Sequence, residues 1–599
     1  MENRIPERKD VPTSDTWDLS SLYADDAAWE KALESMPVLC GKVSAFKLQL
    51  GAAKENLLAA LRNFAEFQQL SEACGNYASL LANADAGESR YQEMLTRYIM
   101  CATECDAALS FLAPEIQAIA DEKINSCLND SAFSDYKIWL TKLLRMKPYI
   151  LSEKEERILA LQGETGRAAQ KAFSVLTNVD LQFGTVTDCD GTEKTLTQST
   201  WSVFMESHDR KIRKDAYTKF YAGFDSVKNT LSGLYEGSVN QDVFTARSRG
   251  FSSSRQAALF PDSVPESVYD NLVGTLRDNL APLHKYYSLR KKILKVDELR
   301  HYDVYVPLVQ GVQRDIPYDD AVEVLRQALS PLGASYTDIL CNGLLQDRWV
   351  DRYENKGKRS GAFSSGSYKS VPFILLNYKS NVLRDVFTMA HEGGHSMHSY
   401  YCARANPFMQ YQYTIFEAEV ASTFNEELLF RYLIKHAQSD AEKAYLISTR
   451  ASDILATLYR QTMFAEFEDK THKMAESGEP LSPDSIRACY RELLCAYFGQ
   501  EMHFEALSDL ESLRIPHFYN AFYVYKYATG VSASLALANR VLSGGKSELN
   551  DYFAFLRSGG SVFPIESLKK AGVDMEKSES IKTAIDYFSS LVDQMERLC

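Results

Sequence analysis

Two histidines and one glutamate in a short segment carry the clearest chemistry in this sequence. The segment is His391-Glu392-Gly393-Gly394-His395, an HExxH pattern. Residues four apart on a helix face the same way, about 6 Å apart, so His391 and His395 can offer imidazole nitrogens to one zinc ion. Glu392 lies about 100° round the helix, where it can act as general base on a zinc-bound water. The pattern predicts a zinc hydrolase; the alternative is two helical histidines without a metal.

The two glycines between the histidines are unusual inside a predicted helix and need a separate explanation. Glycine costs about 1 kcal/mol relative to alanine inside a helix. The missing side chains of Gly393 and Gly394 would let a substrate or another backbone come close. We therefore expect one of these two approaches at this point of the helix.

A catalytic zinc takes three protein ligands and leaves one position for water, so a third ligand is needed. His398 lies seven residues after His391 and on the same face. The two residues would stand about 10.5 Å apart along the helix axis, too far for bonds of about 2 Å to one ion. We therefore expect His398 to orient a ligand or to face the substrate.

A second predicted helix, TIFEAEVASTFNEELLFRYLIKH, supplies acidic candidates for the third ligand. Glu417 and Glu419 point to opposite sides, so they are not expected to act together. Glu419 and Glu426 are seven apart and share a face. One could bind the metal while the other orients a ligand histidine through its second ring nitrogen. Spacing alone leaves open which of the two is the ligand, and a solvated helix face is the alternative for both.

The third candidate segment is RIPHFYNAFYVYKYATG, which combines one histidine with several tyrosines. A histidine and tyrosine hydroxyls are donors that could stabilise the oxyanion of amide hydrolysis. Dense aromatic residues also fill protein cores, and part of this cluster is expected to do only that. Tyr523, Tyr525 and Tyr527 alternate, so they would share a face on a strand and spread apart on a helix.

The elements that must position these residues are mostly helices. Trp29, Leu33 and Met36 form one stripe after a capping Asp25 or Asp26, and long amphipathic patterns follow. Two places break this texture, each with strand-like runs. They are an Asp190-Gly191 hairpin signal and a glycine-rich stretch with runs at 361–363 and 372–378. Helical periodicity resumes after Asn381. The sequence thus predicts a mainly α protein.

The composition of the chain indicates which cellular compartment and which binding partners to expect. The chain has 599 residues, 45% of them hydrophobic, and a net charge of −14, which argues against nucleic acid or an anionic membrane as partner. The polar N-terminus shows no secretory signal. A membrane span needs about 18 consecutive apolar residues, and no apolar run in the sequence is close to that length. Eleven scattered cysteines without CxxC spacing favour free thiols in a reducing cytoplasm. Oligomeric state is left open.

These motifs together resemble one family. The chain is similar to the oligoendopeptidase F group of the thimet oligopeptidase family of zinc peptidases, over nearly its whole length. The resemblance rests on TWDLSSLY, HEGGHSMH, EAEVASTFNE, PHFYNAFYVYKYATG and SGGSVFPIESLKKAGVDM. It implies a mainly helical, two-lobed fold with a deep channel that admits short unstructured peptides, and we place the lobes at 1–200 (helical) and 201–599 (catalytic).

The resemblance also assigns roles to residues. It makes His391, His395 and Glu419 the ligands of one zinc ion, which decides between Glu419 and Glu426, and Glu392 the catalytic glutamate. Two further groups of residues follow from it. The first group, expected to stabilise the transition state, is His517 and Tyr525. The second group, expected to bind substrate, is Tyr519, His398 and Gly361. Gly361 would belong to an edge strand that pairs with the peptide, and Tyr519 lies in a cluster whose spacing is shorter than in the thimet enzymes.

The predicted activity is therefore zinc-dependent endopeptidase hydrolysis of short peptides. A dipeptidyl carboxypeptidase-type exopeptidase on the same fold is the second interpretation. A peptide-binding protein with a structural zinc site, and no catalysis, is a third interpretation of a different class.

Overall fold

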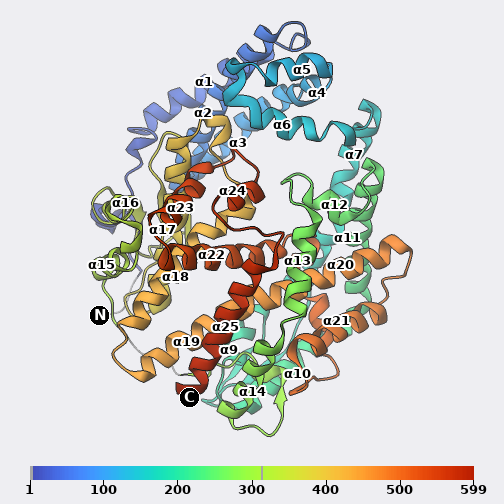
Figure 1. Cartoon of the computed structure of the whole chain (residues 1–599), viewed down its shortest axis with the longest axis vertical. Coiled ribbons are helices and arrows are strands. Elements are labelled where there is room, and N and C mark those ends of the chain that lie inside the picture. The colour runs from blue at the N-terminus through green and yellow to red at the C-terminus, as the bar shows by residue number, and fades with distance from the viewer. Residues whose placement is uncertain (1–4, 310, 312–313, 599) are drawn as a thin grey trace. The chain divides into compact units, whose positions relative to one another are not determined.

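The structure is a computed structural model, and it describes residues 5–309, 311 and 314–598. Helices make up most of the described chain, and the strands are short and few (Figure 1). The expected mainly α fold is confirmed. Within the described residues, every helix is too short or too polar to cross a membrane.

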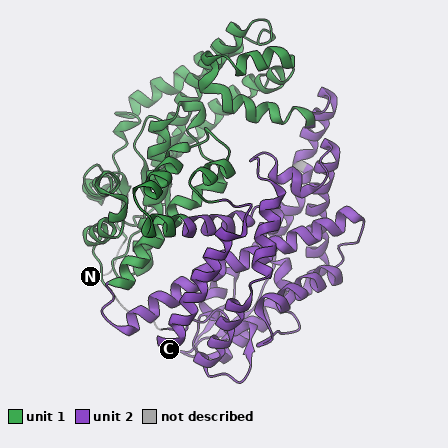
Figure 2. Cartoon of the chain, in the orientation of Figure 1, with its two compact units in different colours: residues 1–148, 313–435, 537–573 green, residues 149–312, 436–536, 574–599 purple. Residues whose placement is uncertain are grey.

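The chain forms two compact units, coloured separately in Figure 2. Unit 1 comprises residues 1–148, 313–435 and 537–573, and unit 2 comprises 149–312, 436–536 and 574–599. The units do not follow the expected linear division at residue 200, because each one collects three separate stretches of chain.

Unit 1 contains a three-stranded sheet and most of the long helices of the first third of the chain. Its elements are α1 (Asp26–Ser44), α2 (Lys54–Ala84), α3 (Ser89–Leu109), α4 (Leu112–Gln117), α5 (Asp121–Leu128), α6 (Lys137–Arg145), α15 (Tyr318–Ala328), α16 (Ala334–Leu345), β4 (Val350–Asp351), β5 (Phe363–Ser365), β6 (Phe373–Leu375), α17 (Leu383–Ala405), α18 (Ile415–Lys435), α23 (Lys546–Ser558) and α24 (Pro564–Lys570).

The first helix forms as its sequence predicts. Asp25 is its N-cap, and the Asp25 carboxylate accepts a hydrogen bond from the backbone N–H of Ala28. Trp29, Leu33 and Met36 are buried on one stripe. The Trp29 indole N–H donates to the backbone oxygen of Cys74 on α2 at 2.9 Å, so α1 is fixed to α2 by a polar as well as an apolar contact.

The sheet of unit 1 has the strand order β4-β6-β5. β4 is parallel to β6, and β5 is antiparallel to β6 with Ser364 opposite Ile374. β5 overlaps the first run expected from the sequence and β6 lies within the second, whereas β4 was not expected. Within the described residues β5 pairs with β6 alone, so β5 is an edge strand of this sheet.

The N-terminal segment packs onto this sheet. Trp17 is buried, and its ring lies 6.5 Å from each of the rings of Phe363 on β5 and Phe373 on β6. Arg8 holds both carboxylate oxygens of Asp351, the last residue of β4. The segment therefore supports β5 from the face that Phe363 occupies.

Unit 2 is helical apart from two small strand pairs. Its elements are α7 (Glu153–Gly166), α8 (Ala168–Val175), β1 (Thr185–Thr187), β2 (Glu193–Thr195), α9 (Gln198–Met205), α10 (Arg210–Ser226), α11 (Lys228–Arg249), α12 (Ser254–Leu259), α13 (Glu266–Arg277), α14 (Ala281–Leu294), β3 (Leu299–Arg300), α19 (Asp440–Ile454), α20 (Gln461–Ser477), α21 (Pro483–Phe498), β7 (Met502–His503), α22 (Tyr525–Ser543, which runs on into residues assigned to unit 1) and α25 (Ser578–Leu598). β1 and β2 form the hairpin expected at Asp190-Gly191, and Gly191 has the left-handed φ of 80° that such a turn requires.

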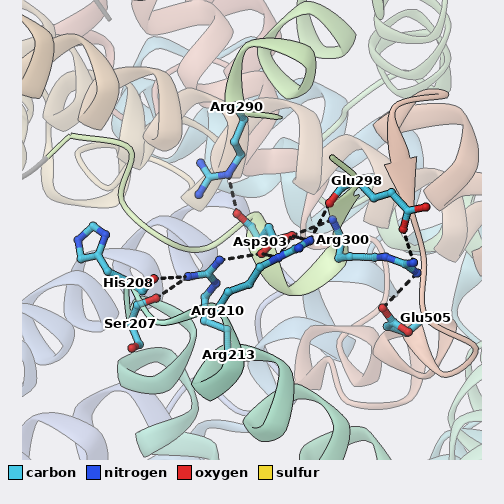
Figure 3. A network of polar contacts seen from close by, with 9 residues as sticks. All are labelled: Ser207, His208, Arg210, Arg213, Arg290, Glu298, Arg300, Asp303 and Glu505. Atoms are coloured by element: carbon cyan, nitrogen blue, oxygen red, sulfur yellow. Dashed lines mark hydrogen bonds and ion pairs between the residues drawn. The ribbon is translucent and has the colours of Figure 1, made fainter. Parts of the chain in front are cut away.

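A buried carboxylate organises part of unit 2. Asp303 is fully buried and accepts hydrogen bonds from the guanidinium groups of Arg210 and Arg213, at 2.8 and 2.7 Å (Figure 3). The backbone N–H of Arg300 donates to the same carboxylate, and Arg290 donates to the backbone oxygen of Asp303. Burial opposes the charge of Asp303, yet these donors keep its pKa below the usual value.

Candidate metal and catalytic site

The HExxH segment lies in the middle of helix α17 of unit 1, as the sequence predicts. The Nε2 atoms of His391 and His395 are 3.1 Å apart. Glu419, near the start of α18, places Oε2 3.4 Å from Nε2 of His391 and 3.7 Å from Nε2 of His395. The three predicted ligand atoms thus converge, and among the described residues this is the group that could hold a metal ion.

The spacing of these atoms fits a tetrahedral zinc site. Two ligands bound at about 2.0–2.1 Å in a tetrahedron lie about 3.3 Å from each other. The separations of 3.1, 3.4 and 3.7 Å lie close to this value. Two imidazoles and one carboxylate are also a donor set that catalytic zinc takes, so the residues fit the ion.

Each of the two histidines has a neighbouring hydrogen-bond acceptor that orients its ring. Glu426 Oε1 lies 2.5 Å from Nδ1 of His391, which directs the other nitrogen of that ring toward Glu419. The backbone oxygen of Ala418 accepts a hydrogen bond from the ring of His395. Glu419 therefore lies beside Nε2 of both histidines and Glu426 beside Nδ1 of His391, two arrangements that spacing alone did not distinguish.

Charge at the site favours a cation. Burial opposes protonation of His391, but the carboxylates of Glu426, Glu392 and Glu419 outweigh it and raise the pKa of His391 to about 9. Burial and the neighbouring His391 lower the pKa of His395 to about 3. Three carboxylates surround two imidazoles, so the group attracts positive charge.

Glu392 is nearly buried, on the side of α17 that faces β5. Burial is the main cause that raises the pKa of its carboxyl to about 7, while the backbone N–H of Ser364 on β5 donates to it and acts in the opposite direction. A pKa near neutrality suits a group that takes up and returns a proton. The Ser364 hydroxyl also contacts that of Ser396 at 2.8 Å, which holds β5 against α17.

The second glycine of the segment lets another backbone come close. A Cβ at Gly394 would stand 2.5 Å from the backbone oxygen of Ala421 and 2.6 Å from Cα of Ser422, both on α18. A Cβ at Gly393 would meet only the flexible end of Leu340 at 3.3 Å. Of the two approaches expected from the sequence, α18 accounts for Gly394.

The remaining predicted residues of unit 1 differ in how they fit their expected roles. His398 is fully buried and stacks on Tyr413 with ring centroids 3.8 Å apart, so this position does not expose it to a substrate. Burial lowers its pKa to about 3, which keeps the ring neutral. Gly361 is exposed two residues before β5, with a left-handed φ of 85°.

The aromatic segment lies in unit 2 and separates its side chains into buried and exposed ones. Tyr525, at the start of α22, is buried beside Tyr269, and burial raises the pKa of its hydroxyl. Tyr519 stacks on Phe173 with ring centroids 4.3 Å apart. His517 is exposed. The packing of Tyr519 and Tyr525 corresponds to the core role that was the alternative for this segment.

Two tyrosines that the predicted site omitted lie beside His517. The ring of His517 is 6.5 Å from that of Tyr523 and 6.2 Å from that of Tyr527. Tyr523 and Tyr527 are themselves 5.4 Å apart and partly exposed. Four-residue spacing was the available signal, because both residues share a face on a helical turn.

Comparison with known proteins shows where this chain belongs. Residues 203–587 match the peptidase family M3, and residues 115–183 match the oligopeptidase F domain of the same family. The chain belongs to peptidase family M3. It is 40% identical to oligopeptidase PepF of Bacillus subtilis, covering 100% of this chain and 89% of that protein. It is 39% identical to an oligoendopeptidase F homolog of Borreliella burgdorferi, covering 99% of both.

Solved structures agree with this M3 assignment. A putative peptidase from Chlamydophila abortus matches with a TM-score of 0.94 and 35% identity, over 100% of both chains. Oligoendopeptidase-F from Enterococcus faecium matches with a TM-score of 0.73 and 29% identity, over 96% of this chain and 99% of that one. The family resemblance noted in the sequence is confirmed, and the protein is a peptidase.

Proposed function

We propose that this M3 peptidase is a zinc metalloendopeptidase that cuts internal bonds of short, unstructured peptides. The observation that carries the proposal is the convergence of one atom each from His391, His395 and Glu419. The names of the relatives, oligopeptidase and oligoendopeptidase, support peptides as the substrate class. We propose the cytoplasm as its compartment, because its eleven cysteines are scattered without CxxC spacing.

In this proposal His391, His395 and Glu419 hold the zinc, and Glu426 keeps His391 in the orientation that binding needs. When bound, zinc supplies a Lewis acid that polarises a carbonyl and lowers the pKa of water. Every other function at the site belongs to side chains and backbone groups of this chain.

Glu392 takes a proton from the attacking water and then delivers it to the leaving amine. Its carboxyl, with a pKa raised to about 7 by burial, can do both near neutral pH. The N–H of Ser364 keeps the carboxylate at the edge of β5. A peptide that adds to that edge as a further strand would lie beside the proton acceptor.

For the oxyanion we propose donors from the aromatic segment. The resemblance assigns His517 and Tyr525 to this role, with Tyr519 binding substrate. The exposure of Tyr523 and Tyr527 beside His517 makes them competing candidates. Replacing Tyr523, Tyr525 and Tyr527 by phenylalanine, one at a time, identifies the oxyanion donor, since loss of one such donor lowers kcat by about 100- to 1,000-fold.

The decisive test replaces Glu392 by glutamine and measures zinc content and hydrolysis of an end-blocked peptide. We expect bound zinc to be retained and kcat to fall by at least about 100-fold, since a general base contributes about that much. The matched control is Glu566→Gln, at an exposed position of the same unit. Near-full cleavage by the zinc-loaded Glu392→Gln variant would defeat the assignment.

Two other outcomes would redirect the proposal. Hydrolysis of free-ended peptides alone would favour the dipeptidyl carboxypeptidase interpretation. Tight peptide binding by a zinc-loaded wild-type protein that cuts nothing would favour the non-catalytic interpretation.

A further inference from the structure

A cavity lies beneath the turn that joins β5 to β6 in unit 1. Its volume is about 200 Å³. Gly366 and Ser367 of the turn line one wall, and Ser399 and Ala403 of α17 line another. Tyr413, from the chain between α17 and α18, closes a third side. The catalytic roles proposed above do not use this cavity.

The cavity begins one helical turn beyond the candidate metal ligands. Ser399 follows His395 by four residues, which is about 6 Å along the axis of α17 and close to the same face. The Ser399 hydroxyl lies 3.0 Å from that of Tyr413, and Tyr413 stacks on His398. The wall formed by Tyr413 is therefore backed by His398, three residues after His395 on α17.

The cavity also adjoins the chain that leads out of β5. Ser364 lies against the turn of α17 that follows the proton acceptor Glu392, because its hydroxyl is 2.8 Å from that of Ser396. Gly366 is two residues further along the same chain, and two residues of an extended strand span about 6.6 Å. A peptide that pairs with β5 and is cut beside Glu392 would therefore bring a residue about two positions from the cut bond to the cavity.

The lining favours an uncharged aromatic side chain. It consists mainly of tyrosine rings and serine hydroxyls. Its one guanidinium, that of Arg404, is stacked on the ring of Tyr400, 3.4 Å from the ring centroid. The nearby carboxylate of Glu72 already accepts hydrogen bonds from Tyr411 and Gln412. An aromatic ring would gain ring contacts here, whereas a carboxylate would have to draw Arg404 off the ring of Tyr400 to be paired.

We propose that this cavity is a subsite for one aromatic side chain of the substrate, about two residues from the bond that is cut. The proposal rests on the proposed peptidase function and adds a specificity to it. The substrate class becomes short peptides with phenylalanine or tyrosine at that position.

The test fills the cavity from α17. Ala403→Phe places a ring in it, and Ala405→Phe, on the same helix at an exposed position outside the lining, is the matched control. The substrates are end-blocked, alanine-based peptides that carry one phenylalanine or one glutamate at each position in turn. Mass mapping gives the cut site, and rates give kcat/KM. Zinc content and thermal midpoint confirm that each variant is folded.

For the wild type we expect kcat/KM about 10-fold higher with phenylalanine than with alanine at one position, the discrimination that an apolar subsite provides. Glutamate there should give no gain. Ala403→Phe should reduce the phenylalanine preference below about 2-fold, while Ala405→Phe behaves as wild type.

A wild type without any positional preference would overturn the subsite. So would a preference that survives in zinc-loaded, folded Ala403→Phe, or one that Ala405→Phe removes equally. These failures differ from failure of the proposed function, in which the zinc-loaded wild type cuts none of the peptides.

Discussion

Replacing Gly394 by alanine measures how closely α17 and α18 must approach for the metal group to form. The added Cβ would stand 2.5 Å from the backbone oxygen of Ala421, whereas ordinary contacts begin at 3.4 Å. The obstructing atoms are backbone, so a side-chain rotation cannot relieve the contact. The helices must separate locally by about 0.9 Å, the difference between these distances, unless the added methyl group is accommodated by strain.

Such a movement acts directly on the ligand set. His395 adjoins the substituted residue on α17, whereas Glu419 lies on α18, two residues before Ala421. Zinc sites tolerate ligand displacements of about 0.2 Å, less than a quarter of the expected separation. We therefore expect zinc affinity to fall by at least about 10- to 100-fold, as when the support of a ligand is lost. The free energy of unfolding should fall by about 1–3 kcal/mol, typical of overpacking.

Gly393→Ala is the matched control, one residue away in the same helix. Its Cβ would meet only the methyl groups of Leu340 at 3.3 Å, and these can give way. Removing a glycine from a helix interior gains about 1 kcal/mol. We expect Gly393→Ala to keep full zinc affinity and to melt at or slightly above the wild-type temperature.

The assay is a competitive zinc titration of both variants, combined with thermal melting and peptide hydrolysis at saturating zinc. Wild-type zinc affinity and activity in Gly394→Ala would refute the argument that helix approach sets the site. An equal loss in both variants would refute it too, because the cause would then lie in the glycine pair and not in contact with α18.

Three further predictions concern packing and buried charge. Burial lowers the pKa of His301 to about 3, so stability should be lost as the pH falls from about 6.5 toward 3. His301→Asn should flatten the pH dependence of the free energy of unfolding, measured in urea, by up to about 1.4 kcal/mol per pH unit. Asp303→Asn leaves the buried guanidinium of Arg213 without its anion and should cost about 3–5 kcal/mol in urea unfolding. Trp17→Ala removes the ring behind Phe363 and should lower the free energy of unfolding by about 3–5 kcal/mol. Because β5 then loses support, KM should rise more than kcat falls. An unchanged KM would contradict this.

Much of the candidate site could be predicted because its signals are local. HExxH identifies two candidate ligands through helix periodicity alone, and the cap and apolar stripe of α1 follow from neighbouring residues. Spacing within one helix did not separate Glu419 from Glu426, because it does not contain the distance between two helices, and only the family resemblance favoured Glu419. The tight approach at Gly394 selects Glu419 for the position beside both histidines.

Other features depend on tertiary packing and left no local signal. Ser364 and Ala418 act through backbone groups, whose contribution does not depend on side-chain identity. His398 lies on the ligand face of α17, yet stacking on Tyr413 buries it. The exposure of Tyr523 and Tyr527 and the burial of Tyr525 likewise follow from neighbours far away in sequence, such as Tyr269.

The interleaving of the two units has a consequence for synthesis on the ribosome. Unit 1 begins with the first residues of the chain but closes only with residues 537–573, and unit 2 waits for 574–599. At about 5–20 residues per second, the chain between residues 148 and 573 takes about 20–85 s to emerge. Neither unit can complete its core during that time. A nascent or prematurely terminated chain would carry the HExxH segment without the finished unit around it, so we expect peptide cleavage to begin only once synthesis is nearly complete.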